Sequence, residues 1–386
     1  MEFIDLARQQ QGIRGKIDAN IRTVLDHGKY IMGPEIKALE GKLAEYVGAK
    51  YAVACSSGTD ALLLALMGYG VGPGDAIITS PFTFIATAEV ISLLGATPVF
   101  ADTDQVTYNL DPKHVERAIH AIKNHSRDYP LPRKNGRSLT PKGVIAVDLF
   151  GLPADYDTIN SVSRQHNLFV IEDAAQSFGA QYRGKRACSL GDVGCTSFFP
   201  AKPLGCYGDG GMCFTNDKGL HEVMRSLCVH GQGSHKYENV RIGINGRLDT
   251  LQAAVLLAKF EVFPEEISMR DEVAGNYSKL LSNGKAKVVV PSVPSGYSSV
   301  WAQYSILARD GNHRAELQKR LKEAGIPTAI YYPKPLHLQT AFRSLGYKEG
   351  DFPVSEKAAG RIFSLPMHPY LSREDQERVV SVLAEK

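Results

Sequence analysis

Several features that mark specialised protein classes are missing from this 386-residue chain. Its 44 Lys and Arg residues nearly balance its 41 Asp and Glu residues, and the formal net charge is only +3. A charge this small does not favour nucleic acid as a partner. The longest apolar run, residues 61–67, is far too short to cross a bilayer, and residues 1–5 lack the basic and apolar regions of a secretory signal. We therefore expect a cytoplasmic protein without nucleic-acid or membrane partners.

Cysteine is also scarce, and its spacing excludes two common uses. None of the six residues falls in a C-x-x-C pair or in a Cys/His pattern typical of zinc. Several lie in apolar runs, where small buried thiols are common. We expect free thiols and no bound metal; the six are Cys55, Cys188, Cys195, Cys206, Cys213 and Cys228.

The chain does contain a regular alternation of strand-like and helix-like runs. Helix-like runs at residues 59–67 and 86–94 separate the first short apolar runs from one another. Such alternation predicts an α/β protein with a mostly parallel sheet flanked by helices. The expected strands are residues 51–55, 76–79, 97–100, 144–150, 169–172, 196–199 and 212–215.

The length favours two lobes. We expect an N-terminal arm and large domain over residues 1–262 and a smaller α+β domain over residues 263–386, with Phe263-Pro264-Glu265 at the boundary. Ser372 followed by Asp375 resembles a capping box at the start of a final helix. Further helices are expected within residues 1–30 and over residues 35–47, 248–260, 267–281 and 314–324.

Residues 121–142 differ in composition from the rest of the chain. They hold three prolines and six Lys or Arg residues against one acidic residue, which predicts an exposed inserted loop. A basic loop of this kind is usually a solvated face, and binding of a substrate phosphate is the alternative.

The strongest chemical signal is the pair formed by Asp173 and Lys202. Asp173 ends an apolar strand-like run, and Lys202 follows in a loop framed by Pro200 and Pro203. Pyridoxal phosphate needs an amine for its aldehyde and an anion for its ring nitrogen. A carboxylate buried at a strand end requires a partner, which a protonated ring nitrogen would supply. The alternatives are a helix N-cap for Asp173 and an exposed surface position for Lys202.

Two further segments fit the same cofactor. In residues 55–62, C-S-S-G-T-D-A-L, a strand ends and a helix begins, so that backbone N–H groups at Gly58 and Thr59 are placed to bind a phosphate. Ser197 is placed to reach the same phosphate. Phe84 follows a strand and can stack on a flat ring, or it can belong to the core. Gln176 can bond the ring hydroxyl, or it can be a surface amide.

Five motifs together resemble the DegT/DnrJ/EryC1/StrS aminotransferases. They are S-S-G-T-D-A-L, F-T-F-I-A-T-A-E, I-E-D-A-A-Q-S-F-G-A, S-F-F-P-A-K-P-L-G-C-Y-G-D-G-G and R-I-G-I-N-G-R-L-D-T-L-Q-A-A. The resemblance covers essentially the whole chain. It implies a fold-type-I enzyme that uses pyridoxal phosphate and passes through the pyridoxamine phosphate form, with a mostly parallel seven-stranded sheet in its large domain.

The resemblance also implies roles for individual residues. Lys202 is the Schiff-base lysine, and Asp173 is the partner of the ring nitrogen. Asn245 reaches in from a second subunit, which implies a homodimer with shared active sites. Arg247 is a candidate for an acidic group of the substrate, with a surface ion pair as the alternative. The remaining cofactor contacts are Gly58, Thr59, Phe84, Gln176 and Ser197, and candidate substrate contacts are Tyr331 and Tyr332, which stand where relatives often carry His-Tyr-Pro.

Within the family, the lysine motif and the run S-L-P-M-H-P-Y-L most resemble enzymes that act on UDP-linked keto-sugars. The implied reaction moves an amino group from L-glutamate to C3 of a 2-acetamido-3-keto-hexuronate, for bacterial surface polysaccharide. A C4 aminotransferase and a non-catalytic regulator that binds the cofactor are the alternatives. A sugar 3-dehydratase of this fold carries histidine instead of the lysine, and Lys202 argues against that reading.

Overall fold

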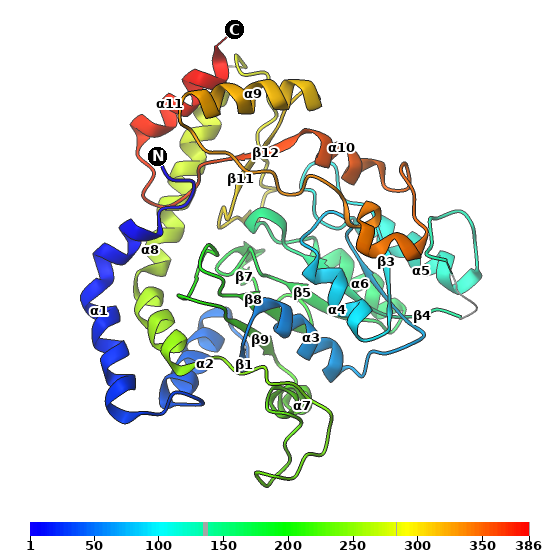
Figure 1. Cartoon of the computed structure of the whole chain (residues 1–386). Helices are drawn as coiled ribbons and strands as arrows, with labels where there is room; N and C mark the ends of the chain where they lie inside the picture. The colour runs from blue at the N-terminus through cyan, green and yellow to red at the C-terminus, as the bar shows by residue number, and fades with distance from the viewer. Residues whose placement is uncertain (134–137, 283, 386) are drawn as a thin grey trace.

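The computed structural model describes residues 1–133, 138–282 and 284–385. At the centre of the described chain lies a seven-stranded sheet with strand order β1-β9-β8-β5-β4-β2-β3 (Figure 1). Neighbours from β8 to β3 are parallel, and β9 is antiparallel to both β8 and β1. The mostly parallel α/β sheet predicted from the sequence is therefore confirmed. Its strands are β1 (Tyr51–Cys55), β2 (Asp75–Thr79), β3 (Thr97–Phe100), β4 (Thr140–Val147), β5 (Phe169–Asp173), β8 (Val193–Ser197) and β9 (Gly211–Thr215).

Helices cover both faces of this sheet because successive strand residues point to opposite sides. Ile171 packs in the core beneath α3 (Gly58–Gly68) and α7 (Lys218–Cys228). Its neighbour Val170 packs in the core beneath α5 (Pro112–Asn124) and α6 (Tyr156–Gln165). The other helices around the sheet are α2 (Pro34–Val47) and α4 (Ala86–Leu93), with the 3₁₀ turn η1 (Leu149–Gly151) after β4.

The chain order of the strands brings the predicted site residues to one edge. β1 runs in the same direction as β8 and β5, because β9 is antiparallel to β1 and to β8. The carboxyl ends of β1, β5 and β8 therefore meet, and ligands of open α/β sheets bind at this edge. These ends lead into Ser56, Asp173 and Ser197.

The helix at the predicted domain boundary differs from the prediction. Residues 248–260 and 267–281 were expected as two helices, but α8 is continuous over Thr250–Leu281 and contains Pro264. Phe263 and Ile267, on either side of the proline, both pack in one core with α2 and β9. Packing on both sides compensates for the backbone bond that the proline removes. The division at residue 263 remains a proposal.

The remaining helices and short strands lie outside the central sheet, several of them around α8. Helix α1 (Leu6–His27) lies along α8 at the left of Figure 1, with α9 (Gly311–Glu323) and α11 (Arg373–Ala384) at the top. The Ser372 hydroxyl accepts a bond from Asp375 N at 3.1 Å, which confirms the predicted cap. The remaining elements are α10 (Pro353–Arg361), η2 (Leu336–Leu338), η3 (Thr340–Leu345), the pair β11 (Tyr304–Leu307) and β12 (Ile362–Leu365), and the small sheet of β6 (Gln181–Tyr182), β7 (Lys185–Arg186) and β10 (Tyr297–Ser298).

The segment 121–142 is less loop-like than predicted. Residues 121–124 complete α5 and residues 140–142 begin β4, while residues 134–137 lie outside the described residues. Tyr129 and Leu139 are buried in the core beneath α5. The prediction of an exposed loop was thus wrong for these parts, because apolar side chains spaced between the basic ones join that core.

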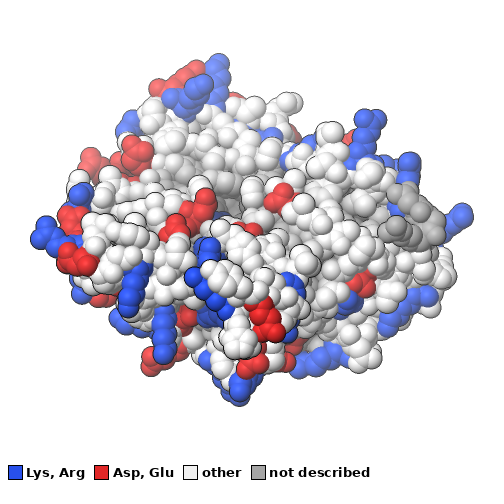
Figure 2. Space-filling view, turned by 60° about the horizontal axis from the view of Figure 1, so that its bottom comes forward, with Lys and Arg blue, Asp and Glu red and all other residues white. Residues whose placement is uncertain are grey.

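Surface and cysteine chemistry agree with the composition. On the face shown in Figure 2, basic and acidic side chains are interspersed, and broad areas carry neither. All six cysteines are free and buried, as predicted. Among the described helices, none combines the length and the apolar character that a bilayer crossing requires.

Candidate active site

Lys202 lies in an irregular turn after β8, as the flanking prolines predict. Its backbone N–H donates to the carbonyl of Phe199 at 2.8 Å, which closes the turn. Burial lowers the pKa of the Lys202 amine, and the nearby Asp173 carboxylate acts in the opposite direction. A lowered pKa increases the fraction of neutral amine, which is the nucleophilic form. The structure therefore brings together the two residues that the sequence paired.

Asp173 is the last residue of β5 and is only 5% exposed. The hydroxyl of Thr87, on α4, donates to Oδ2 at 2.8 Å, and the N–H of Ala175 donates to Oδ1 at 3.3 Å. Burial raises the pKa of this carboxyl group, against the effects of these bonds and of Lys202. Both bonded donors are neutral, so the carboxylate is suited to a cationic ligand.

Gln176 is held at both ends of its amide. Its Oε1 accepts from the N–H of Phe150 at 2.8 Å, and its Nε2 donates to the hydroxyl of Tyr332 at 3.2 Å. The reading of Gln176 as a surface amide is wrong, since the residue is only 5% exposed. These bonds connect a predicted cofactor residue to a predicted substrate residue.

Aromatic rings line the side of the site next to Gln176. Phe84 is 55% exposed, so it is not the core residue that the alternative reading required. Its ring centroid lies 6.3 Å from that of Tyr332, with 40° between the ring planes. An uncovered ring of this kind is available to stack on a flat ligand. Tyr331 is half-buried, and its ring centroid lies 6.4 Å from that of Phe3 in the N-terminal arm.

The turn between β1 and α3 is closely packed around two glycines. Ser57 caps α3 by accepting from the N–H of Asp60 at 3.0 Å. A Cβ added to Gly58 would lie 2.6 Å from Cβ of Ser197, and one added to Gly211 would lie 2.3 Å from the carbonyl oxygen of Ser57. The first N–H groups of a helix have no intrahelical partner, which leaves those of Gly58 and Thr59 for an anion.

Asn245, which is exposed, and Arg247, which is half-buried, lie apart from these groups in the segment before α8. Arg247 Nε donates to Asn245 Oδ1 at 3.0 Å. Both residues line a cavity of about 410 Å³ that also includes Ser56, the residue before the Ser57 cap. Within the described residues of one chain they therefore border the turn of Gly58 without reaching Lys202 or Asp173 in any bond.

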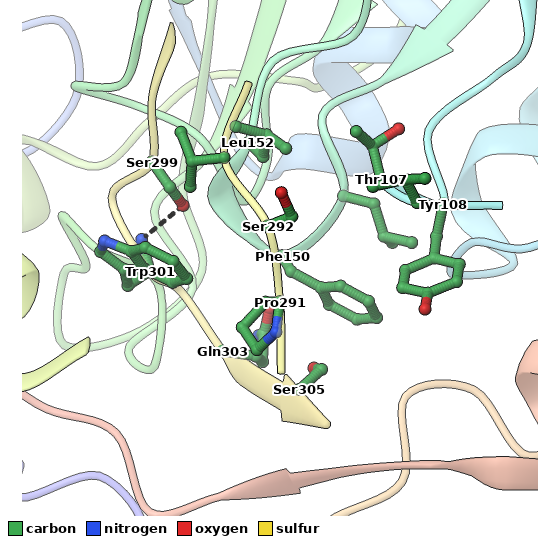
Figure 3. A pocket seen from close by; sticks show the side chains of 13 residues that line it. Thr107, Tyr108, Phe150, Leu152, Pro291, Ser292, Ser299, Trp301, Gln303 and Ser305 are labelled. Atoms are coloured by element: carbon green, nitrogen blue, oxygen red, sulfur yellow. Dashed lines mark hydrogen bonds between the residues drawn. The ribbon is translucent and has the colours of Figure 1, made fainter. Parts of the chain in front are cut away.

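A much smaller cavity lies behind Phe150. It measures about 30 Å³ and is lined by Tyr108 and Phe150 on one side and by Ser292 and Trp301 on the other (Figure 3). This volume is enough to hold ordered water. The N–H of Trp301 donates to Ser299 Oγ at 3.0 Å at its margin. The cavity is too small for a sugar and is not part of the candidate site.

Sequence reasoning missed Thr87, which bonds Asp173 across 86 positions of the chain. The one available signal was its place in the motif F-T-F-I-A-T-A-E, three residues after Phe84. It also missed that Asp148 and Glu172 lie on one face of the sheet, since nothing in a single sequence shows that β4 and β5 are neighbours.

The residues present fit pyridoxal phosphate. A helix N-terminus with tightly packed glycines suits its phosphate, an exposed aromatic ring suits its ring, and a buried carboxylate beside a desolvated lysine suits its ring nitrogen and its aldehyde. This site on an α/β sheet of mixed direction defines the class: a fold-type-I, pyridoxal-phosphate-dependent aminotransferase.

Comparison with known proteins gives the family. Residues 11–384 match the DegT/DnrJ/EryC1/StrS aminotransferase family, and the chain belongs to it. The chain is 50% identical to the UDP-2-acetamido-2-deoxy-3-oxo-D-glucuronate aminotransferase of Pseudomonas aeruginosa, over 96% of each chain. The resemblance noted in the sequence is thereby confirmed.

Solved structures agree. The crystal structure of a DegT DnrJ EryC1 StrS aminotransferase from Brucella abortus superposes with a TM-score of 0.93 at 48% identity, covering 99% of this chain and 98% of that one. The structure of NtdA from Bacillus subtilis, 28% identical with a TM-score of 0.87 and covering 99% of this chain and 84% of that one, contains the pyridoxamine phosphate form of the cofactor. The predicted fold, enzyme class and cofactor are confirmed.

Proposed function

We propose that this enzyme transfers an amino group from L-glutamate to C3 of a UDP-linked 2-acetamido-3-keto-hexuronic acid. The observation that carries the choice of sugar is the 50% identity, over 96% of each chain, to an aminotransferase named for that type of substrate. Arg247 supports it, because a guanidinium matches the carboxylate of a uronic acid with two parallel bonds.

The cofactor would be held by the residues that meet at the strand ends. Lys202 would bind its aldehyde carbon, Asp173 its ring nitrogen, and Phe84 one face of its ring. When bound, pyridoxal phosphate supplies an electron sink that acidifies the hydrogen beside the amino group and carries that group between the two substrates. The other proposed contacts are Gln176 at the ring, Gly58, Thr59 and Ser197 at the phosphate, and Asn245 from a second copy of the chain.

The protein's own residues supply proton handling and orientation. Lys202 Nζ, whose pKa is lowered by burial, takes a proton from one carbon and returns it to another near neutral pH. Asp173 stays oriented through the bonds from Thr87 and Ala175, and Gln176 fixes the hydroxyl of Tyr332. Tyr331 and Tyr332 would contact the sugar, and Arg247 its carboxylate.

The wider setting follows from the same proposal. A contact from Asn245 of a second copy makes the assembly a homodimer with two shared sites. We place the enzyme in the cytoplasm, in agreement with its six free thiols, and in the synthesis of a surface polysaccharide such as an O-antigen. The division into a cofactor domain (1–262) and a small domain (263–386) is part of this proposal.

Product analysis tests the proposal. The enzyme with pyridoxal phosphate and L-glutamate is given the UDP-linked 3-keto-hexuronate or, separately, a nucleotide-linked 4-keto-6-deoxy sugar, and the products are identified by NMR. We expect amination at C3 of the first substrate and formation of 2-oxoglutarate. Preferred amination of the 4-keto sugar would overturn the substrate, and no 2-oxoglutarate with either would leave the regulator as the better reading.

A further inference from the structure

Two buried carboxyl groups lie behind the candidate site, on the face of the sheet opposite to the side chain of Asp173. Asp148, which follows β4, and Glu172, in β5, are 0% exposed, and Asp173 is 5% exposed. Pairing of β4 with β5 places Asp148 and Glu172 on one face of the sheet, because Ala146, two residues before Asp148, is opposite Glu172 in the register. The N–H of Asp148 donates to the carbonyl oxygen of Asp173 at 3.1 Å. The proposed function uses only Asp173.

Asp148 accepts three bonds from neutral groups. Its Oδ1 accepts from the hydroxyl of Tyr156 at 2.8 Å and from the N–H of Ala154 at 3.0 Å. Its Oδ2 accepts from the hydroxyl of Ser177 at 2.7 Å. These donors fix the position of the carboxyl group, and none of them cancels its charge.

Glu172 is also held by neutral donors, the backbone N–H groups of Cys188 at 2.5 Å and Leu190 at 2.8 Å. An interaction with the Asp148 carboxyl group, on the same face of the sheet, helps to raise the pKa of the Glu172 carboxyl group. Two carboxyl groups bond to each other only when one of them carries a proton, since ionised carboxylates are acceptors alone. Like charges at this separation do not both ionise readily.

We propose that Asp148 and Glu172 form a buried pair that shares one proton, and that this pair positions Asp173 and leaves it as the charged carboxylate of the site. With its proton the pair carries one negative charge instead of two, which limits repulsion on Asp173. Asp173 differs from both because Lys202 acts to lower the pKa of its carboxyl group. The role toward Asp173 rests on the proposed function, whereas the pair itself does not.

The surroundings agree with a proton held near neutral pH. Burial raises the pKa of Asp148 to about 7, and burial and Asp148 together raise the pKa of Glu172. The other titratable groups around the pair are Asp173 and the neutral side chains of Tyr156 and Cys188, whose pKa values burial raises further.

A raised pKa links this proton to folding. Between pH 3.8 and about 7 the folded protein holds a proton at Asp148 that the unfolded chain releases. The stability that this proton contributes to the folded state is fully present below pH 3.8, and it is lost as pH rises through about 7. Asp148→Asn and Glu172→Gln each replace the shared proton with an amide N–H, and should therefore remove this dependence.

The experiment compares the cofactor-loaded wild type with Asp148→Asn, Glu172→Gln and the control Tyr156→Phe. Infrared spectra of the native proteins at pH 6 should show the carbonyl band of a protonated carboxylic acid in the wild type and in Tyr156→Phe. The band should be lost in both amide variants. Urea unfolding from pH 4 to 7 should show one proton fewer linked to folding in the amide variants, while Tyr156→Phe lowers stability at every pH and keeps the slope.

A third readout addresses Asp173. The visible absorption of the bound cofactor should show a titration step near pH 7 in the wild type that is lost in the amide variants. Retention of the infrared band and of the unfolding slope in both amide variants would overturn the pair. If the amide variants lose the infrared band and the unfolding slope but keep the cofactor titration step, the pair stands and only its proposed effect on Asp173 is overturned. Failure of the wild type to bind the cofactor would overturn the proposed function, and the infrared result would still decide the pair.

Discussion

The two ends of the candidate site are built in opposite ways. At the cofactor end, Asp173 and Gln176 are each 5% exposed and are held by bonds from α4, η1 and the segment around Tyr332. At the other end, Asn245 is exposed, and its bonded side chain is Arg247, two positions along the chain. Burial with full bonding fixes position and charge state, while the less buried pair of Asn245 and Arg247 is free to be completed by a ligand or by a second copy.

This difference separates chemistry from recognition. The buried end has groups whose protonation the protein controls, as the shifted pKa values of Lys202 and Asp173 show. The exposed end presents donors and charges to the large cavity next to Ser56. We expect substitutions at the buried end to abolish the reaction for every substrate, and substitution of Arg247 at the other end to change which substrate is used.

Lys202→Ala should give the largest effect. Loss of the proton carrier should lower turnover on the order of 10³-fold or more with any sugar, while circular dichroism shows an intact fold. Lys185→Ala, at an exposed position of β7, is the matched control and should retain activity. Activity of Lys202→Ala within about tenfold of the wild type would contradict the assignment.

Asp173→Asn should have the next largest effect, followed by Thr87→Val. Asparagine cannot pair as an anion with a protonated ring nitrogen, so turnover should fall on the order of 10²-fold. Thr87→Val removes one neutral bond to Oδ2, worth about 1 kcal/mol, and should weaken cofactor binding roughly fivefold. Steady-state kinetics measure the turnover of Asp173→Asn, and absorbance titration with pyridoxal phosphate measures cofactor binding in both variants. An effect of Thr87→Val equal to that of Asp173→Asn would show that orientation, and not charge, is decisive.

Arg247→Ala should change recognition selectively. Removal of a charge-assisted contact should raise KM for the uronate substrate by roughly 10- to 100-fold, with the glutamate half-reaction unchanged. Arg241→Ala, exposed in the same segment, is the control. Steady-state kinetics with a UDP-linked 3-keto sugar that lacks the carboxylate complete the test. An equal rise in KM with both sugars would mean that Arg247 supports the structure and does not bind the carboxylate.

Lys259→Met tests whether burial alone makes a lysine functional. We expect it to have the smallest effect on activity. Lys259, in α8, is 1% exposed, and burial lowers its pKa to about 8, with Glu266 acting in the opposite direction. A cation with a lowered pKa makes the wild type gain stability as pH rises from about 8 to 10. Calorimetry should show that Lys259→Met lacks this gain, with activity within about twofold of the wild type. A large loss of activity would show that Lys259, like Lys202, is needed for the reaction.

Much of the buried end was predictable because its signals are local. The α/β alternation follows from apolar runs, and Lys202 stands in a rigid turn because prolines flank it. Asp173 was found because a carboxylate directly follows apolar strand residues. The helix expected to end before Pro264 continues instead, since Phe263 and Ile267 pack in one core, a contact that no local pattern reveals.

The amino-acid sequence by itself determined the chemistry of this enzyme: a lysine and a carboxylate at strand ends, a glycine-containing helix start, and enough apolar alternation to build the sheet between them. Only the tertiary structure decided which other residues hold these groups in place. Thr87 bonds Asp173 from 86 positions away, and Asp148 meets Glu172 because β4 and β5 are neighbours. Periodicity and motif spacing report what a residue does within its own segment, whereas contacts between distant segments arise only when the sheet has formed.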